Sequence, residues 1–251
     1  MNLKEKMRRG DFCIGPFLKA GSPEIVEVSG YAGFDFVLLD MEHGPLSYET
    51  IEHLVLAAER VGIAPVVRVE AITESAVMRP LDKGAAGILV PHVDSGEMAR
   101  SVVRFSRFGP AGERGMDMYS RAAQYGHLPK KEYMQKANQD TSLILQIEGS
   151  EGLRNLDEIL AVPGSDVIFV GPYDLSQSLG MPGEIDHPKV VQAIESIVVK
   201  VRESGRGVGI YADNVEAAKK WIAVGVQFIA LSVDTAIYYQ GCKRLVGALR
   251  Q

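Results

Sequence analysis

Short apolar segments alternate with longer segments of helical periodicity along the whole chain. The apolar segments are rich in β-branched residues and contain few polar positions, which is typical of parallel strands buried on both faces. There are eight such segments: residues 12–15, 36–39, 65–69, 87–90, 143–147, 167–170, 208–211 and 228–231. Eight buried strands separated by helices predict an α/β fold, a single (β/α)8 TIM barrel spanning residues 1–251.

The segments between the predicted strands carry helix-start signals. Ser47 precedes apolar residues at helical spacing, which predicts a helix capped by its hydroxyl. His187–Pro188 opens another helix, because proline suits the first helical turn. Residues 108–128 are rich in glycine and lack helical periodicity, so a long loop is expected there, followed by a helix at 129–138. Residues 171–186 are expected to include a short helix.

Composition and charge exclude several classes of protein. The 251 residues are 46% hydrophobic and 24% charged, as in ordinary globular proteins. The net charge is −5 and basic residues do not cluster, so no nucleic-acid partner is expected. A membrane span needs about 18 consecutive apolar residues, and no such run is present. The two cysteines lie far apart in sequence, without the close spacing of a structural zinc site or a redox motif. A cytoplasmic protein without a membrane partner is expected.

Polar residues gather at the ends of the predicted strands. In a TIM barrel the catalytic groups come from the C-terminal ends of the strands, which meet at one rim. An isolated polar residue there is more often a helix cap or a surface charge than a catalyst, so their convergence carries the argument. The polar positions are residues 40–45 after the second strand, Arg68 in the third, His92 after the fourth, Gln146 and Glu148 at the end of the fifth, and residues 171–174 after the sixth.

Arg68 is the hardest of these residues to explain as a structural feature. It lies inside the apolar run 65–69. Burying a guanidinium costs several kcal/mol unless an anion or a ring of acceptors compensates. A substrate carboxylate or a developing enolate would be such a partner.

Glu148 and Asp174 follow adjacent strands, which brings their carboxylates close together. Oxygen ligands suit a hard divalent ion such as Mg²⁺ or Mn²⁺. Two other interpretations remain open: a pair of helix N-caps, or a carboxylate dyad that shares one proton.

His43 lies in a turn before Gly44–Pro45, where it is a candidate general base. The histidines at 53, 127 and 187 are expected to be structural or solvated, and His92 is at the rim.

Lysines are absent from the ends of the third to eighth predicted strands, which argues against Schiff-base catalysis. Lys19, just after the first strand, is the exception and the one candidate for such a mechanism. The loops after the last two strands lack paired glycines, which disfavours a phosphosugar substrate.

Six motifs together resemble the HpcH/HpaI family of metal-dependent, pyruvate-using class II aldolases, in the order found in that family. They are Asp40-x-Glu42-His43-Gly44-Pro45, Val67-Arg68, Leu89-Val90-Pro91, Pro110-Ala111-Gly112-x-Arg114-Gly115, Gln146-Ile147-Glu148 and Gly171-Pro172-x-Asp174-Leu175-Ser176. The resemblance covers nearly the whole chain. It implies a barrel whose C-terminal helix is exchanged between subunits, and a homohexamer.

The resemblance also implies a role for each site residue. Glu148 and Asp174 would hold Mg²⁺ or Mn²⁺, with Co²⁺ as a further candidate. Other implied roles are His43 as base, Asp82 orienting that histidine, Arg68 on the keto oxygen of pyruvate, Gln146 beside pyruvate, and the backbone of Gly171, Pro172, Tyr173 and Asp174 on its carboxylate. Tyr173, Lys19 and Val69–Glu70 depart from the family pattern.

The implied activity is cleavage or formation of a 4-hydroxy-2-oxoacid, with pyruvate and an aldehyde as the partners and a pyruvate enolate as intermediate. A citrate-lyase-like acyl-CoA lyase on the same fold is the alternative, although no basic cluster suited to a nucleotide is present. A non-catalytic binding or assembly barrel is a third interpretation.

Overall fold

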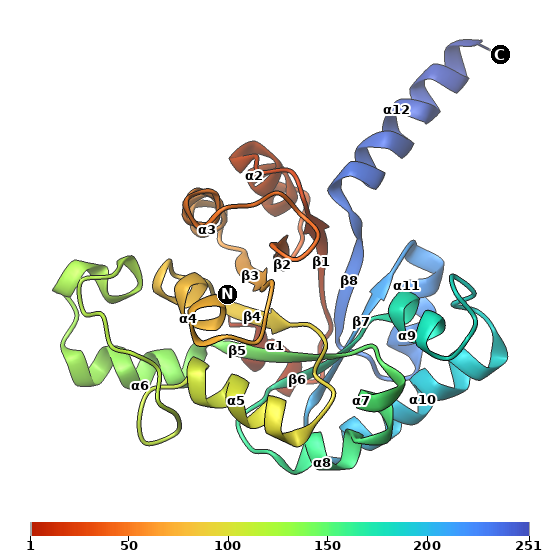
Figure 1. Cartoon of the computed structure of the whole chain (residues 1–251). Helices are drawn as coiled ribbons and strands as arrows, with labels where there is room; N and C mark the ends of the chain where they lie inside the picture. The colour runs from red at the N-terminus through yellow and green to blue at the C-terminus, as the bar shows by residue number, and fades with distance from the viewer. Residues whose placement is uncertain (1, 251) are drawn as a thin grey trace.

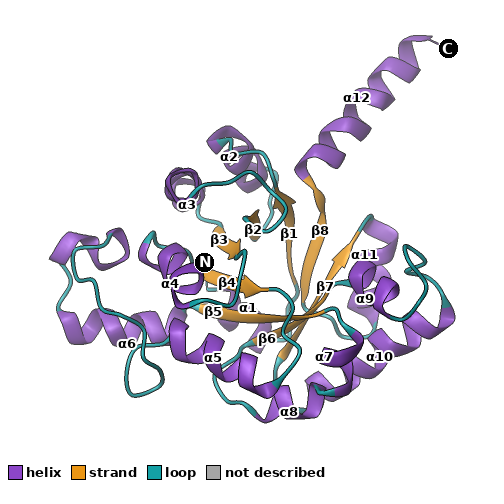
Figure 2. Ribbon diagram, viewed as in Figure 1, coloured by secondary structure: helices purple, strands orange, loops and turns teal. Residues whose placement is uncertain are grey.

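A computed structural model describes residues 2–250 and confirms the predicted barrel (Figures 1 and 2). Eight parallel strands close on themselves in the order β1 to β8, with helices around them. The strands are β1 Cys13–Leu18, β2 Phe36–Asp40, β3 Ala64–Arg68, β4 Gly87–Val90, β5 Ser142–Ile147, β6 Val167–Val170, β7 Gly207–Ala212 and β8 Phe228–Val233. Each overlaps one predicted strand.

Helices follow the strands around the outside of the barrel (Figure 2). Their bounds are α1 Leu3–Arg8, α2 Pro23–Tyr31, α3 Tyr48–Val61, α4 Glu74–Asp82, α5 Gly96–Ser106, η1 Arg121–Gly126 (a 3₁₀ helix), α6 Lys130–Asp140, α7 Ser150–Arg154, α8 Leu156–Ala161, α9 Pro172–Ser178, α10 Pro188–Glu203, α11 Val215–Ala223 and α12 Asp234–Arg250. Ser47 caps α3 as predicted, since its hydroxyl accepts the Thr50 N–H at 3.1 Å.

Aromatic side chains fill the interior of the barrel. Phe36 and Phe228 stack with their ring centroids 4.1 Å apart, and Phe169 meets Phe228 edge to face. Leu3 and Met7 of α1 join the same buried cluster, so α1 packs across the end where the strands begin. Because this end is packed, the functional site of the barrel is expected at the end where the strands finish.

The register of the strands sets which side chains meet at that open end. Asp40 is the last residue of β2 and pairs in register with Arg68, the last residue of β3. Both residues are buried. Neighbouring strands lie about 4.8 Å apart, so register neighbours can exchange direct side-chain contacts.

The glycine-rich segment 108–128 is more ordered than a long loop. It contains η1, and Phe108, Ala123 and Tyr133 form a small buried cluster beside the barrel. The ring centroids of Phe108 and Tyr133 lie 5.5 Å apart. Tertiary contacts with α6, rather than helical periodicity, therefore stabilise this segment.

Helix α12 leaves the barrel as a projecting arm, coloured blue in Figure 1. Its exposed apolar side chains are Ile237, Tyr238, Tyr239, Leu245, Val246 and Leu249. Its base is fixed to the barrel because Asp234 accepts the backbone N–H groups of Lys19 and Ala20. Across residues 2–250, the helices are all too short or too polar to cross a membrane.

Candidate active site

The guanidinium of Arg68 is bound by two carboxylates at the mouth of the barrel. Its Nε lies 2.9 Å from Asp40 Oδ1 and its Nη2 lies 2.8 Å from Asp40 Oδ2. Its Nη1 lies 3.0 Å from Glu42 Oε2. Although burial opposes ionisation of Asp40, the hydrogen bonds and charge of Arg68 outweigh burial and lower the pKa of Asp40. Protein carboxylates therefore supply the anion that the buried arginine requires.

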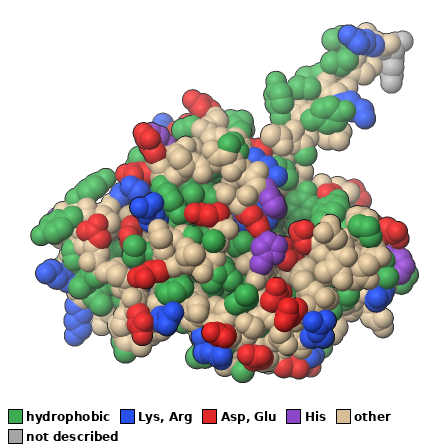
Figure 3. Space-filling model, viewed as in Figure 1, with side chains coloured by type: hydrophobic (Ala, Val, Ile, Leu, Met, Phe, Trp, Pro, Cys, Tyr) green, Lys and Arg blue, Asp and Glu red, His purple; other side chains and the backbone are tan. Residues whose placement is uncertain are grey.

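A cavity of about 290 Å³ opens above this pair. Arg68 and Gln146 line it from strands β3 and β5, and Asp174 lines it from the first turn of α9. His43 and Lys19 line it as well. Gly171, Pro172 and Tyr173 complete the lining beside Asp174. Figure 3 shows histidine and acidic side chains next to one another near the middle of the face in view. A cavity of this size suits a small organic acid with a second small molecule.

Glu148 is buried beside the cavity, at the end of β5. Its Oε1 accepts the His92 backbone N–H at 2.9 Å, and its Oε2 accepts the Gln146 side-chain amide. Burial raises the pKa of Glu148 to about 7, against the opposing effect of His92, and the charge of Asp174 raises it further. The ionised carboxylate therefore needs a cation nearby.

Glycine at position 171 gives Glu148 and Gln146 the room they occupy. A Cβ at Gly171 would come within 2.7 Å of Glu148 Oε2 and within 2.9 Å of Gln146 Nε2. Real Cβ atoms essentially never approach that closely, so another residue at 171 would displace one of these side chains.

The carboxylates of Glu148 and Asp174 do not cap helices. Gly149 and Gly171 are the N-cap residues of α7 and α9, and Asp174 lies exposed in the first turn of α9. Within residues 2–250, the carbonyl Oε1 of Gln146 is buried without a hydrogen-bond partner. Oxygen donors with an unpartnered buried amide oxygen beside them suit a hard divalent ion.

A cluster of three side chains at the rim could also bind a metal ion. Glu42, His92 and Glu148 each offer one ligand atom, and these atoms lie within 4.8 Å of one another. His92 Nδ1 is 2.9 Å from Glu148 Oε1, and His92 Nε2 is 2.9 Å from Glu42 Oε1.

Lys19 and Tyr173 also line the cavity. Lys19 Nζ is 4.0 Å from Asp40 Oδ2, and the Tyr173 hydroxyl donates to Asp213 Oδ2 at 2.9 Å. The Tyr173 and Tyr211 rings lie 6.1 Å apart and both line the cavity. These residues can therefore contact a substrate bound in the cavity.

The family model for HpcH/HpaI aldolase/citrate lyase matches residues 14–240. The chain belongs to this family. The resemblance drawn from its motifs is thus confirmed.

Relatives in this family align with the HpcH/HpaI barrel along nearly its whole length. The 2-keto-3-deoxy-L-rhamnonate aldolase of Salmonella gallinarum is 38% identical over 236 residues, which are 94% of this chain and 88% of that protein. An HpcH/HpaI aldolase/citrate lyase family protein from Burkholderia cenocepacia J2315 superposes with a TM-score of 0.94 at 32% identity over 100% of both chains. The citrate synthase SbnG superposes with a TM-score of 0.91 at 34% identity, over 100% of this chain and 98% of that one.

Asp82 does not reach His43 within one chain of this HpcH/HpaI barrel. It ends α4, which runs back toward the start of β4, whereas His43 follows the end of β2. Its Oδ1 accepts a hydrogen bond from Arg114 Nη2 at 2.6 Å. Burial raises the pKa of Asp82, and Arg114 opposes this. Asp82 can orient His43 only if it comes from another copy of the chain.

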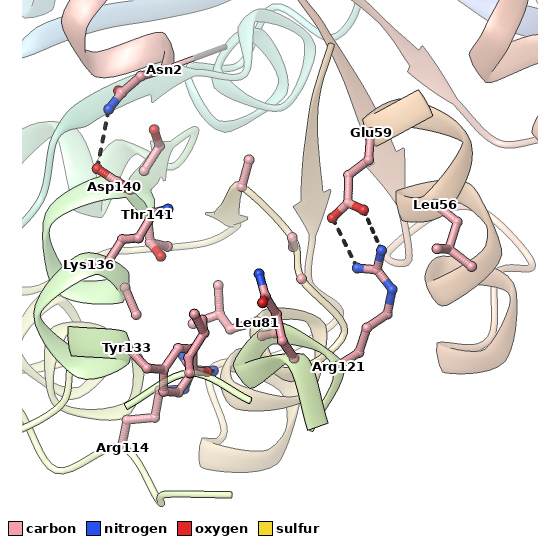
Figure 4. Close-up of a pocket in the computed structure, with 18 of the residues that line it drawn as sticks. Asn2, Leu56, Glu59, Leu81, Arg114, Arg121, Tyr133, Lys136, Asp140 and Thr141 are labelled. Atoms are coloured by element: carbon pink, nitrogen blue, oxygen red, sulfur yellow. Dashed lines mark hydrogen bonds and ion pairs between the residues drawn. The ribbon is translucent and has the colours of Figure 1, made fainter. Parts of the chain in front are cut away.

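A larger cavity, of about 700 Å³, lies at the other end of the barrel (Figure 4). Leu3 and Ser142, near the strand starts, line it together with residues of η1 and α6. Arg121 pairs with Glu59 across it, and Asn2 donates to Asp140 at 3.4 Å. It is far along the strands from Arg68 and Glu148, so the smaller cavity is the candidate active site.

Two features of the mouth did not follow from strand ends alone. The motif that contains Asp40 and Glu42 does not predict their pairing with Arg68. The position of His92 at the rim predicts no partner for its ring. The strand register could have suggested the first pairing, since Asp40 and Arg68 are both strand-end residues on neighbouring strands. Nothing in the sequence indicates that the His92 ring turns toward Glu148.

Proposed function

We propose that this protein is a divalent-metal-dependent aldolase that cleaves or forms 4-hydroxy-2-oxoacids, with pyruvate and an aldehyde as the smaller partners. The observation that carries the proposal is the shared cavity of Arg68, His43, Gln146 and Asp174, with the buried carboxylate of Glu148 beside it. A guanidinium and a metal site facing one small cavity suit a reaction that develops negative charge on an oxygen.

Glu148 and Asp174 would hold the ion, with Mg²⁺ or Mn²⁺ as the expected metals and Co²⁺ as a further candidate. The ion would supply positive charge to the keto oxygen as the carbon–carbon bond breaks. Arg68 would bind the same oxygen through the part of its guanidinium that faces the cavity. Such a preorganised contact increases the reaction rate by a factor of about 10² to 10³.

The pyruvate carboxylate would lie at the start of α9. Pro172 has no N–H and the Gly171 N–H is directed to the Ile147 carbonyl at 3.3 Å. The first-turn N–H groups of Tyr173 and Asp174 have no acceptor within the helix and can bind a carboxylate. The Gln146 amide, next to Gly171, would also contact pyruvate.

His43 would accept the proton of the C4 hydroxyl as the bond breaks, directly or through water. Its imidazole is exposed at the mouth, and its backbone N–H is fixed by Asp40 Oδ1 at 3.2 Å. Asp82 would orient this histidine across a contact between copies of the chain, since α4 holds it away from His43 of its own chain.

The relatives guide the choice of substrate. A 2-keto-3-deoxy sugar acid is itself a 4-hydroxy-2-oxoacid, and aldolases acting on 2-keto-3-deoxy-L-rhamnonate are 38% identical to this chain. We therefore expect substrates of this class. Tyr173 and Lys19 would contact the aldehyde part, because both line the cavity and both are partly open to solvent.

One alternative has a specific observation in its favour. The citrate synthase SbnG is 34% identical and superposes along the whole chain. Addition of an acyl-CoA enolate to the keto carbon of oxaloacetate would use the same Arg68 and carboxylates, because negative charge again develops on the keto oxygen. The test below includes it, because an acyl-CoA and oxaloacetate are then consumed without added aldehyde.

The assembly is expected to be a homohexamer in which α12 is exchanged between subunits. The exposed apolar residues of α12 support this, since a monomer would leave them in water. A cytoplasmic location is expected for such a metabolic enzyme.

The deciding experiment incubates the protein and Mn²⁺ with pyruvate and a panel of aldehydes, and identifies the adducts by mass spectrometry. We expect 4-hydroxy-2-oxoacids that disappear when a chelator is added or when Glu148→Gln replaces the native protein. The same site should decarboxylate oxaloacetate slowly, because that reaction forms the same enolate. A parallel reaction supplies an acyl-CoA and oxaloacetate without pyruvate or aldehyde, and turnover of the acyl-CoA there would favour the alternative instead.

A further inference from the structure

Three side chains from different strand ends meet at the rim of the barrel. Glu42 follows β2, His92 follows β4, and Glu148 follows β5. Each offers one ligand atom to a space small enough for a single ion. The family motifs used above contain Glu42 and Glu148, but His92 lies outside all of them.

The two nitrogens of His92 face different carboxylates. Nε2 lies 2.9 Å from Glu42 Oε1, and Nδ1 lies 2.9 Å from Glu148 Oε1. A neutral imidazole carries one N–H and one lone pair. If Nε2–H donates to Glu42, the lone pair of Nδ1 faces Glu148 Oε1, and two acceptors at this distance require a cation or a proton between them.

This arrangement is the one that metal-binding histidines commonly use. A ligating histidine almost always donates its other N–H to a carboxylate, which fixes the tautomer and the orientation of the ring. Glu42 is itself held by Arg68 Nη1 at 3.0 Å, so the carboxylate that would orient His92 is fixed in place. Gln146 adds a buried Oε1 that lacks a partner within residues 2–250 and belongs to a side chain lining the cavity.

We propose that His92 Nδ1 is a ligand of the divalent ion held by Glu148, with Glu42 orienting the imidazole. The inference rests on the proposed function, because it requires an ion at Glu148. A nitrogen ligand changes which ion is favoured: imidazole suits transition metals, whereas Mg²⁺ prefers a shell made of oxygen atoms. The protein therefore favours Co²⁺ over Mg²⁺ more strongly than a site made only of carboxylates would.

The competing explanation is an ion pair in which a protonated His92 bridges the two carboxylates. The His92 side chain is 63% exposed, so water could solvate such a pair. The two explanations differ in what a bound ion touches. A ligand nitrogen couples to a paramagnetic ion, whereas a protonated imidazole is repelled from it.

The test uses the full-length protein, stripped of metal and loaded with Mn²⁺. Electron spin-echo envelope modulation then detects a ¹⁴N nucleus bound to the ion. We expect nitrogen coupling in the native protein and in His53→Gln, a matched control on α3, and loss of coupling in His92→Gln. Titration calorimetry with Co²⁺ and Mg²⁺ should show the Co²⁺ preference falling about 10- to 100-fold in His92→Gln.

The outcomes separate this inference from the proposed function. Mn²⁺ that binds through Glu148 without nitrogen coupling in the native protein would overturn the role of His92 and leave the aldolase proposal standing. Coupling that survives in His92→Gln would overturn it as well. Equal Mn²⁺ affinity in native protein and Glu148→Gln would reject both, because no ion would then depend on Glu148.

Discussion

Asp40 and Arg68 are register neighbours at the ends of β2 and β3, and two parallel hydrogen bonds of 2.9 and 2.8 Å join their charged groups. Asp40 has no exposed surface and Arg68 has little. Bidentate pairing fixes the plane of the guanidinium, so the face of Arg68 that lines the cavity has a defined orientation. The same pair therefore stabilises the barrel and orients a group proposed to bind substrate.

Replacing Arg68 should damage both stability and chemistry. Arg68→Ala leaves the buried charge of Asp40 without its partner, which costs about 3–5 kcal/mol in free energy of unfolding. Proton exchange at the pyruvate methyl group, followed by NMR in deuterated water, should fall by about 10² to 10³. Arg68→Lys keeps the charge but loses the bidentate contact, so its stability and its exchange rate should lie between those of the native protein and Arg68→Ala. Native exchange rates in a folded Arg68→Ala protein would remove Arg68 from the proposed mechanism.

Gly171 should be required for metal affinity. Gly171→Ala places a methyl group where Glu148 Oε2 and Gln146 Nε2 now lie. Displacing Glu148 should weaken Mn²⁺ binding by about 10- to 100-fold, as measured by calorimetry. Gly241→Ala in α12 is the matched control, because a Cβ there meets no atom within 4 Å. Equal affinities in the two variants would mean that Glu148 does not depend on Gly171 for its position.

The metal-free protein should lose stability as the pH rises from 4.5 to about 7, between the unfolded and folded pKa values of Glu148. Burial raises the pKa of Glu148 from 4.5 to about 7, so between these values the folded protein keeps a proton that the unfolded chain has released. Stability is therefore highest below the unfolded pKa and falls as the pH rises toward about 7. Chemical denaturation from pH 5 to 8 measures this, and Glu148→Gln should flatten the dependence. An equally steep loss in that variant would assign the effect to another group.

Lys19 should not form a Schiff base. Its amine lies 4.0 Å from Asp40 Oδ2, and the proposed chemistry needs no covalent intermediate. Treatment with pyruvate and borohydride should leave the mass of the protein unchanged, while a chelator should abolish turnover. A pyruvate adduct located on Lys19 by peptide mapping would establish the Schiff-base mechanism instead.

The arm formed by α12 should mediate assembly. Leu245 is 66% exposed on the apolar surface of α12, and Leu245→Glu introduces a charge there. We expect the mass measured by light scattering to fall toward that of a monomer. Val199→Glu on α10, at a residue also exposed, serves as the control. Unchanged assembly in Leu245→Glu would show that α12 does not carry the interface.

The barrel itself was predictable because its signals are local. Buried parallel strands need apolar runs, and segments such as 167–170 match their strands residue for residue. Ser47 is the cap that its spacing predicted. The segment 108–128 was less predictable, because η1 is stabilised by the contact of Ala123 with Phe108 and Tyr133 rather than by its own periodicity.

The sequence by itself determined which residues reach the mouth, since strand order places Arg68, Gln146, Glu148 and Asp174 at one rim. Only the tertiary structure decided how they pair. The register joined Arg68 to Asp40, the absence of a Cβ at Gly171 left room for Glu148, and the turn at His92 brought its ring between Glu42 and Glu148. It also placed Asp82 at the far end of α4, against Arg114. These outcomes depend on side-chain directions and distances between segments remote in sequence, which periodicity and spacing do not encode.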